Sequence, residues 1–238
     1  MPGWSWGFSI IGGGKSVPTW EEELVDTFAL DELWTASTNV VLSGSDVTDW
    51  VGVNGNVLSE AGAPPSLVTE DPDFGGNNSL QFTGGEYLVF PAGIVSAISG
   101  ISQFSYVCCV ALSGLSWVFQ DGGSATFRAY YNGSGTLFWD VADGSIATSV
   151  IVSPSASDRV CMTFDGGQSQ PARNKIYFNE ANVTNSVGTP LTVTTSPSQL
   201  LFSLPAGTGH KIALLGIKYG VIDHAGIGAA LQAKGYGP

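Results

Sequence analysis

The chain has 238 residues, of which 43% are hydrophobic, 11% aromatic and 12% charged, and its formal net charge is −12. A nucleic-acid binder needs a basic surface to displace counterions from phosphates. This chain has only 8 Lys and Arg residues against 20 Asp and Glu residues. We therefore expect no nucleic-acid partner, and the same deficit argues against electrostatic binding to anionic lipids. The 32 glycines follow no Gly-X-Y period, which excludes collagen.

Residues 1–25 are predicted to be an N-terminal arm without helical or strand periodicity. Its glycines cluster at Gly12–Gly14, and it ends in the acidic run Glu21–Glu23. Its aromatic residues are Trp4, Trp6, Phe8 and Trp20. Exposed aromatic residues are a liability for an isolated monomer, so the arm is expected to pack against something. That surface is either its own domain or a neighbouring subunit or partner.

Residues 26–238 are predicted to form one all-β domain. Thr27–Trp34 is assigned one or two helical turns, and short strands separated by turns follow from Val40 onward. The expected strands are Leu80–Phe82, Tyr87–Phe90, Gln103–Leu112, Trp117–Gln120, Thr126–Tyr131, Thr136–Asp140, Ile146–Val152, Arg159–Phe164, Lys175–Phe178, Leu200–Leu204 and Lys211–Lys218. Asp-Gly, Asn-Gly and Gly-Gly pairs between them supply the positive φ angles of tight hairpins. Many short strands without intervening helices predict two packed antiparallel sheets, that is, a β-sandwich.

The chain is expected to close with a short C-terminal helix over Val221–Lys234. Asp223 is the expected N-cap, and Gly235 the expected stop. Two interior glycines, Gly226 and Gly228, disfavour this helix because glycine has a low helix propensity.

We expect neither a membrane span nor a secretory signal in this chain. No run of about 18 apolar residues occurs, and the N-terminal residues have neither a basic region nor a long apolar one. The adjacent Cys108 and Cys109 point to opposite faces of a strand, so they are not expected to pair with each other. Buried free thiols are favoured, with a bridge from Cys161 left open. Free thiols indicate folding in a reducing cytoplasm.

Catalysis is not expected from these residues. His210 and His224 stand in no metal-ligand spacing and in no nucleophile motif, so both are interpreted as structural. Glycoside hydrolysis uses two carboxylates that flank the scissile bond. No Glu-x-Asp-x-Glu strand pattern aligns such a pair, and Asp71 and Asp73 flank Pro72 in an expected loop. We therefore predict a protein that is not an enzyme.

Two binding chemistries are weighed. Exposed aromatic rings stack on sugars while polar side chains bind their hydroxyls, and one stretch near predicted turns offers this mixture. Its residues are Tyr130, Tyr131, Asn132 and Trp139, with Asp140 beside them, although aromatic residues on strands more often belong to the core. Calcium prefers several carboxylate and carbonyl oxygens, which Asp121, Asp140 and Asp143 would supply. An ordinary Asp-Gly turn is the more frequent explanation of such positions, so calcium is left open as the lesser alternative and no other cofactor is expected.

Four stretches of the chain match the pattern of one domain family. They are Leu33–Trp34 with Val40–Val47, Trp50 and Gly55–Asn56; Ser79–Leu88; Asn174–Asn179; and Lys211–Gly220 with the closing helix. Together they resemble laminin-G-like, concanavalin-A-like jelly-roll domains of phage and bacterial surface proteins. Glu180 stands where that family usually has glycine. The resemblance runs from about residue 28 to the end, and it is more specific for fold than for function.

The resemblance implies binding or assembly, because the family includes sugar-binding modules, adhesion modules and virion surface proteins. Combined with the arm, it implies a non-enzymatic structural protein of a bacteriophage virion, as a capsid decoration or a tail-associated module. Its expected partners are other capsid or tail proteins and itself, as a homo-oligomer that assembles through the arm in the virion after synthesis in the host cytoplasm. The alternative is a carbohydrate-binding module or lectin that recognises a surface glycan of the host.

Overall fold

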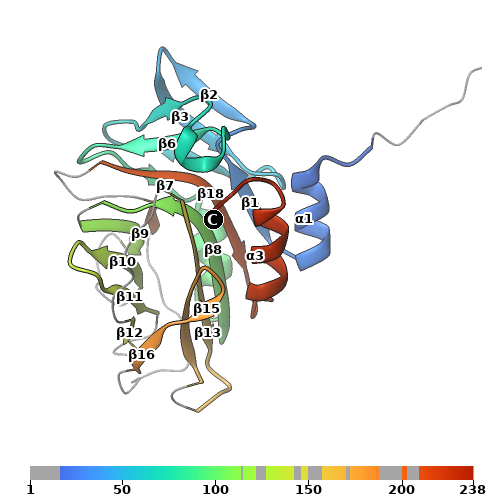
Figure 1. Ribbon diagram of the computed structural model, residues 1–238, viewed down its shortest axis with the longest axis vertical. Coiled ribbons are helices and arrows are strands. Elements are labelled where there is room, and N and C mark those ends of the chain that lie inside the picture. The colour runs from blue at the N-terminus through green and yellow to red at the C-terminus, as the bar shows by residue number, and fades with distance from the viewer. Residues whose placement is uncertain are drawn as a thin grey trace, which may run out of the picture.

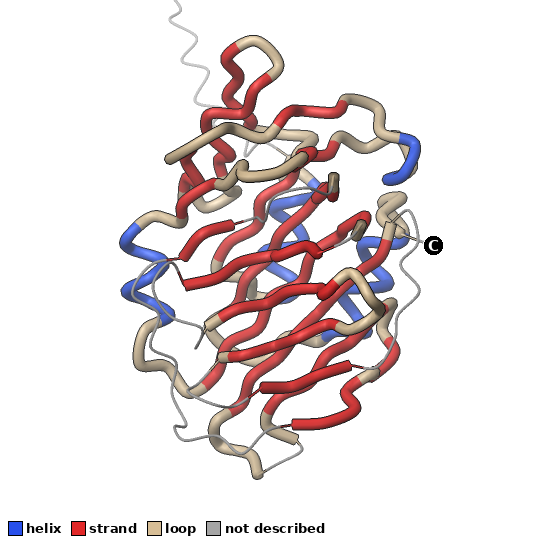
Figure 2. The backbone as a smooth tube through the Cα atoms, turned by 90° about the vertical axis from the view of Figure 1, so that its left-hand side faces the viewer, coloured by secondary structure: helices blue, strands red, loops and turns tan. Residues whose placement is uncertain are grey.

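The computed structural model describes residues 17–113, 115–121, 127–141, 146–149, 157–169, 172–187, 200–202 and 209–237. Strands dominate this part of the chain, and the named strands pair antiparallel throughout (Figures 1 and 2). A helix follows the last strand. The expected mostly β, antiparallel fold with a C-terminal helix is therefore confirmed.

The strands are β1 (Glu32–Thr35), β2 (Val40–Ser43), β3 (Asp46–Val51), β4 (Val57–Glu60), β5 (Ser66–Val68), β6 (Ser79–Phe82), β7 (Leu88–Val89), β8 (Gln103–Ala111), β9 (Leu115–Asp121), β10 (Arg128–Asn132), β11 (Leu137–Asp140), β12 (Ile146–Ser149), β13 (Asp158–Asp165), β14 (Asn174–Phe178), β15 (Ala181–Asn182), β16 (Thr184–Val187), β17 (Leu200–Phe202) and β18 (His210–Lys218). The helices are α1 (Trp20–Phe28), α2 (Ala92–Ile98), α3 (His224–Gln232) and the 3₁₀ turn η1 (Pro72–Phe74).

The strands pair in two runs. The first run is centred on β18, which pairs with β8 along one edge and with β1 and β6 along the other. It continues from β8 through β13 and β14 to β15, and from β6 to β5. The second run has the order β2, β3, β4, β7, β17, β9, β10, β11, β12, β16. One residue pair, Asp46 with Ser66, joins the two runs.

Strand β8 is buried on both faces. Tyr106 and Cys108 belong to a large apolar cluster that draws side chains from both runs of strands. Val107 and Cys109, on the other face, belong to a second cluster that includes residues of α1 and α3. The two helices lie side by side and cover this face (Figure 1). Both faces of the central strands can therefore be apolar, because neither is open to water.

Residues 20–25 were expected to be irregular, but they form most of α1. Thr19 caps the helix: its hydroxyl accepts from Glu22 N at 3.2 Å, and the Glu22 carboxylate accepts from Thr19 N at 2.7 Å. This capping box satisfies two donors that would otherwise be unpaired. The helix thus crosses the boundary predicted at residue 25.

The helical turns expected over Thr27–Trp34 are wrong beyond Phe28. Ala29 adopts a left-handed conformation, with φ of 49°, and its N–H donates to Val25 O, which ends α1. Glu32–Thr35 then pairs with β18 as strand β1. The helix α2 was not expected at all, and it has no side-chain cap at its start. Within the described ranges, no helix is long and apolar enough to cross a membrane.

Helix α3 begins where the sequence predicts. The Asp223 side chain accepts from Gly226 N at 3.1 Å, which confirms Asp223 as the N-cap. The two unfavourable glycines allow close approach: a Cβ at Gly226 would clash with Phe28 of α1, and one at Gly228 would clash with the Glu180 side chain. Their low helix propensity is therefore offset by contacts that a larger residue would prevent.

The three cysteines are free and buried, as expected. Burial raises the pKa of the thiols of Cys108, Cys109 and Cys161. Because the thiolate is the reactive form, these side chains behave as small apolar residues rather than as nucleophiles.

Candidate functional site on the outer face of β10 and β11

Strands β10 and β11 form a hairpin whose turn is held by Asn132. The Asn132 side-chain oxygen accepts from Ser134 N at 2.9 Å and from Thr136 N at 3.0 Å. Such side-chain bonds to the following backbone are typical of asparagine in turns. They set the register in which Tyr130 lies opposite Phe138, and Arg128 opposite Asp140.

The alternation of strand side chains divides this hairpin into two faces. Arg128, Tyr130, Phe138 and Asp140 share one face. Ala129, Tyr131, Leu137 and Trp139 share the other, and they belong to the large apolar cluster. The first set therefore lies on the outer face, turned away from the core.

The expectation that Tyr131 and Trp139 contact a glycan is wrong. Trp139 is 0% exposed and Tyr131 5%. The Trp139 indole N–H donates to Thr163 O at 3.2 Å, and its ring meets that of Tyr106 edge-on, with centroids 5.3 Å apart. A ring enclosed in this way cannot stack on a sugar. Tyr131 and Trp139 are both core residues, which was the other interpretation of the aromatic residues on these strands.

On the outer face, Tyr130 and Phe138 form a stacked pair. Their ring centroids are 4.5 Å apart and their planes are 3° from parallel, and both side chains are half-buried. The Arg128 guanidinium lies 5.2 Å from the centre of the Tyr130 ring, within cation–π range. Its Nε is 3.6 Å from an Asp140 carboxylate oxygen. We call these four residues, Arg128, Tyr130, Phe138 and Asp140, the aromatic platform.

The Tyr130 phenol stays protonated at neutral pH. Burial raises its pKa, Arg128 acts in the opposite direction and Asp140 raises the pKa further, and the net direction is upward. The platform thus offers a neutral hydroxyl that both donates and accepts, next to an ion pair whose charges offset each other. Flat apolar rings beside polar groups are the components with which proteins bind small polar ligands such as sugars.

Of the carboxylates proposed for calcium, the structure describes Asp121 and Asp140. No group of three or more His, Cys, Asp or Glu side chains that could hold a metal occurs among the residues that the structure describes. Asp140 faces Arg128, and Asp121 is buried at the end of β9. Asp143 lies outside the described residues. The described geometry therefore gives calcium no support at these positions.

Three of the four aromatic residues of the arm, Trp4, Trp6 and Phe8, also lie outside the described residues. Trp20 is described, on α1. Its ring lies 5.9 Å from that of Tyr236, and Lys234 Nζ lies 5.8 Å from its centre. At Trp20 the arm thus packs against its own domain, the first of the two alternatives weighed for it.

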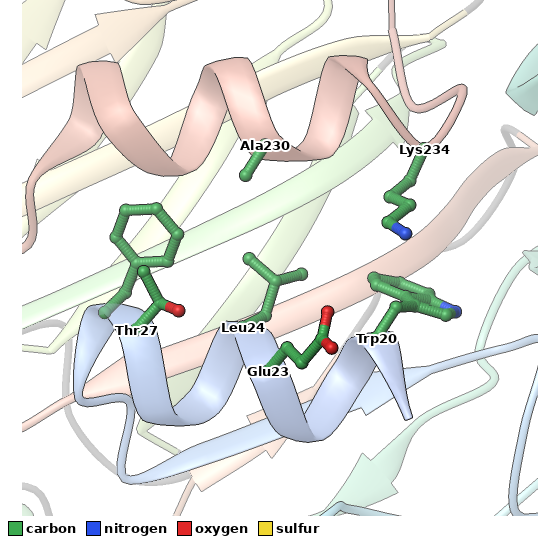
Figure 3. Close-up of a pocket in the computed structure, with 7 residues that line it drawn as sticks. Trp20, Glu23, Leu24, Thr27, Ala230 and Lys234 are labelled. Carbon is green, nitrogen blue, oxygen red and sulfur yellow. The ribbon is translucent and has the colours of Figure 1, made fainter. Parts of the chain in front are cut away.

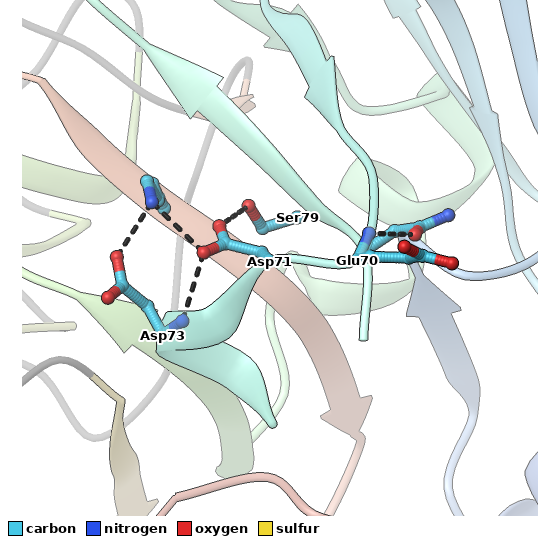
Figure 4. Close-up of polar contacts among 6 residues, drawn as sticks. Glu70, Asp71, Asp73 and Ser79 are labelled. Atoms are coloured by element: carbon cyan, nitrogen blue, oxygen red, sulfur yellow. Dashed lines mark hydrogen bonds and ion pairs between the residues drawn. The ribbon is translucent and has the colours of Figure 1, made fainter. Parts of the chain in front are cut away.

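A second cluster of charged side chains surrounds η1 (Figure 4). Lys211 Nζ is 3.0 Å from Asp71 Oδ1 and 2.7 Å from Asp73 Oδ2. Ser79 donates to the other Asp71 oxygen at 2.5 Å, and Asp73 N donates to Oδ1 at 3.0 Å. Asp71 is fully buried and both its oxygens are occupied. The cluster thus ties η1 to β18.

Asp71 is expected to make stability depend on acid pH. Burial raises its pKa, but the hydrogen bonds from Ser79, Lys211 and Asp73 N outweigh burial and hold the pKa below its ordinary value of 3.8. The contribution of ionised Asp71 to the free energy of unfolding is therefore fully present above pH 3.8. It is lost as the pH falls through the lower pKa that Asp71 has in the folded protein. In Asp71→Asn, the free energy of unfolding measured from about pH 5 to about pH 2 should fall less steeply than in the wild type. Asp26→Asn, at an exposed position on α1, is the control, and equal slopes in all three proteins would refute this role of Asp71.

Both histidines have structural surroundings. His210 is buried at the start of β18, and its ring is stacked on Phe82 with centroids 5.1 Å apart. His224, in the first turn of α3, is stacked on Tyr177 at 3.6 Å.

Sequence reasoning found Tyr130 and Asn132 but missed Arg128 and Phe138. The signal for the missed pair was present, because two-residue alternation and the Asn132-Gly133 turn together fix which residues are opposite each other. Asp140 was predicted as a possible calcium ligand and noted beside the glycan candidates. It lies in the platform, opposite Arg128.

No protein-family model matches this chain, and no curated protein matches it. Solved structures do match. A sialidase of Trypanosoma rangeli is 12% identical, with a TM-score of 0.58 over 95% of this chain and 35% of the sialidase. The binding domain of botulinum neurotoxin serotype C1 is 12% identical, with a TM-score of 0.55 over 79% of this chain and 52% of that chain. The binding domain of botulinum neurotoxin DC is 11% identical, with a TM-score of 0.57 over 88% and 52%.

The chain thus spans about a third of the sialidase and about half of the toxin chains. At these identities the likeness shows the fold alone, and that fold is of the concanavalin-A-like jelly-roll class. The resemblance seen in the sequence is confirmed at this level. These neighbours provide no link to a phage particle.

Proposed function

We propose that this chain is a carbohydrate-binding module and that the aromatic platform is its glycan contact. We also infer that the two runs of strands are the two sheets of a sandwich, with the platform on the outer surface of the second sheet. The observation that carries the proposal is the Tyr130–Phe138 stack at 4.5 Å beside the Arg128–Asp140 ion pair, on the face turned away from the core.

The structural neighbours support a glycan as ligand. One matching structure shows the sialidase in complex with sialic acid, and another reports cell entry of botulinum neurotoxin type C as dependent on two ganglioside molecules. Binding rather than hydrolysis is proposed here, because the carboxylates of η1 are engaged with Lys211 and Asp140 faces Arg128.

The charges favour a neutral glycan over a sialylated one. The chain carries a net charge of −12, which repels an anionic sugar at low ionic strength. The one cation of the platform, Arg128, is already paired with Asp140. A carboxylate-bearing sugar would have to compete with Asp140 for that cation, whereas a neutral sugar needs no such exchange and can bond to Arg128, whose side chain is 25% exposed, while Asp140 stays buried.

The test is a glycan array that holds neutral and sialylated glycans, followed by titration of the full chain with the best ligand. Tyr130→Ala should weaken binding about tenfold, because removal of one stacked ring costs on the order of 1.4 kcal/mol. Tyr130→Phe keeps the ring and should bind nearly as well as the wild type. Tyr87→Ala removes a half-buried aromatic ring elsewhere on the surface and is the matched control. Absence of binding to every glycan, with and without calcium, would refute the proposal.

The assembly role expected from the arm has no comparable geometry to support it. Trp4, Trp6 and Phe8 lie outside the described residues, and Trp20 contacts its own domain. The virion remains a prediction from the arm and the family resemblance, and glycan binding is the function we propose.

A further inference from the structure

A shallow groove is lined by residues of α1 and α3 (Figure 3), two helices that lie side by side (Figure 1). Its volume is about 180 Å³. Its apolar lining comes from Trp20, Leu24 and Phe28 of α1 and from Ala230 of α3, and its polar rim from Glu23, Thr27 and Lys234. Leu24 is buried, whereas Trp20, Phe28 and Ala230 remain half-buried. This is an apolar strip that the described residues leave partly open.

The groove is suited to side chains rather than to a free small molecule. Sites for drug-sized ligands run to about 300–1,000 Å³, which is well above the volume here. Lys234 already lies over the Trp20 ring at one end, and Figure 3 shows Leu24 and Ala230 approaching each other across the middle. An aromatic side chain laid along this strip would contact apolar atoms of both helices.

The segment that precedes α1 has the matching chemistry. Residues 1–16 contain Trp4, Trp6 and Phe8 and no acidic residue, and Lys15 is their one charged side chain. The first turn of α1 is acidic, with Glu21, Glu22 and Glu23. Opposite charges at these two places favour a return of the segment onto the helix that it precedes.

The segment also has the necessary reach within one molecule. The described chain starts at Val17, and 11 residues separate Phe8 from Trp20. At 3.3–3.6 Å per residue they span up to about 36–40 Å when extended. Helix α1 has nine residues, or about 14 Å at 1.5 Å each. Gly12–Gly14 allow the chain to reverse, because glycine accepts both signs of φ.

We propose that residues 4–8 dock into the α1–α3 groove of their own chain, with an aromatic side chain against Trp20, Leu24 and Phe28. The interaction covers the apolar strip and is separate from the aromatic platform. It does not depend on the proposed glycan binding.

The test compares two neighbouring alanines of α3 in the full chain. Ala230 lines the groove and Ala229 is exposed. Chymotrypsin cleaves after Trp and Phe, so the cleavage rate within residues 1–16, followed by mass spectrometry, reports how well they are protected. Ala230→Arg fills the groove and should raise that rate about tenfold, as expected when protection follows the population of the open state. Ala229→Arg should leave the rate unchanged.

Equal cleavage rates in the wild type, Ala230→Arg and Ala229→Arg would overturn the proposal. Size-exclusion chromatography with light scattering provides a second readout. If Ala230→Arg, but not Ala229→Arg, converts an oligomer into a monomer, a second copy of the chain occupies the groove. That result would also overturn the proposal. If thermal melting shows that Ala230→Arg does not fold, Thr27→Arg on the exposed rim replaces it with the same expected result.

Discussion

Replacement of Trp139 by alanine is expected to lower the free energy of unfolding by about 4 kcal/mol, as is typical for a fully buried large aromatic residue. The indole is 0% exposed, and its ring meets those of Phe104, Tyr106 and Phe127 at centroid distances of 6.1, 5.3 and 6.0 Å. Alanine would leave a cavity among these rings and remove the donor to Thr163 O. Urea unfolding followed by circular dichroism measures the change.

Substitutions on the two faces of the β10–β11 hairpin should lower the free energy of unfolding by different amounts. Trp139→Phe retains most of the volume and should lose less stability than Trp139→Ala. Tyr130→Ala, on the outer face, should cost on the order of 1 kcal/mol, because its ring is half-buried and packs against Phe138 and Arg128 rather than in the core. A Trp139→Ala protein that is as stable as the wild type but no longer binds a glycan would reverse our assignment of the faces.

Arg159→Met is expected to lower the free energy of unfolding by about 3 kcal/mol, the low end for loss of one partner of a buried ion pair, because Glu180 keeps some exposure. The Arg159 side chain is 4% exposed and that of Glu180 28%. Arg159 Nε and Nη2 each donate to a Glu180 carboxylate oxygen at 2.7 Å, and Nη1 donates to Tyr236 O at 2.8 Å. Hydrogen bonding to Glu180 raises the Arg159 pKa, so the side chain stays charged. One residue thus ties β13 to the β14–β15 turn and to the C-terminal segment.

Two variants control for this effect in the same urea unfolding experiment. Arg173→Met removes an arginine that bonds to Gln168 O at the surface, and it should change stability by less than about 0.5 kcal/mol. Arg159→Met combined with Glu180→Gln removes both charges and should be more stable than Arg159→Met alone. A loss below about 1 kcal/mol in Arg159→Met would show that the pair contributes little.

The strands were predictable where side chains alternate strongly. β8 and β13 were located to within one residue at each end, because a period of two is visible without knowledge of what covers each face. β18 was located equally well, as a short apolar run between Lys211 and Lys218. Helix α1 was missed although its signal, Thr19 with Glu22 three residues later, stands in the sequence. The aromatic and glycine-rich residues before it dominated the interpretation of the whole segment.

The platform was only partly predictable, for a physical reason. Tyr130 and Tyr131 are neighbours on a strand, so they cannot both face a ligand. The sequence does not say which of them is buried, because that depends on contacts with distant strands, such as the bond from Trp139 to Thr163 O on β13. Only the folded chain shows that Tyr130 and Phe138 lie outside while Tyr131 and Trp139 lie inside.

The most direct test of glycan binding at the platform is an NMR titration of the full chain, labelled at its aromatic rings, with the best neutral glycan from the array. Our account predicts that the ring signals of Tyr130 and Phe138 shift in proportion to occupancy while those of Tyr131 and Trp139 stay in place. Shifts confined to rings outside the β10–β11 hairpin, with Tyr130 and Phe138 unchanged, would contradict it.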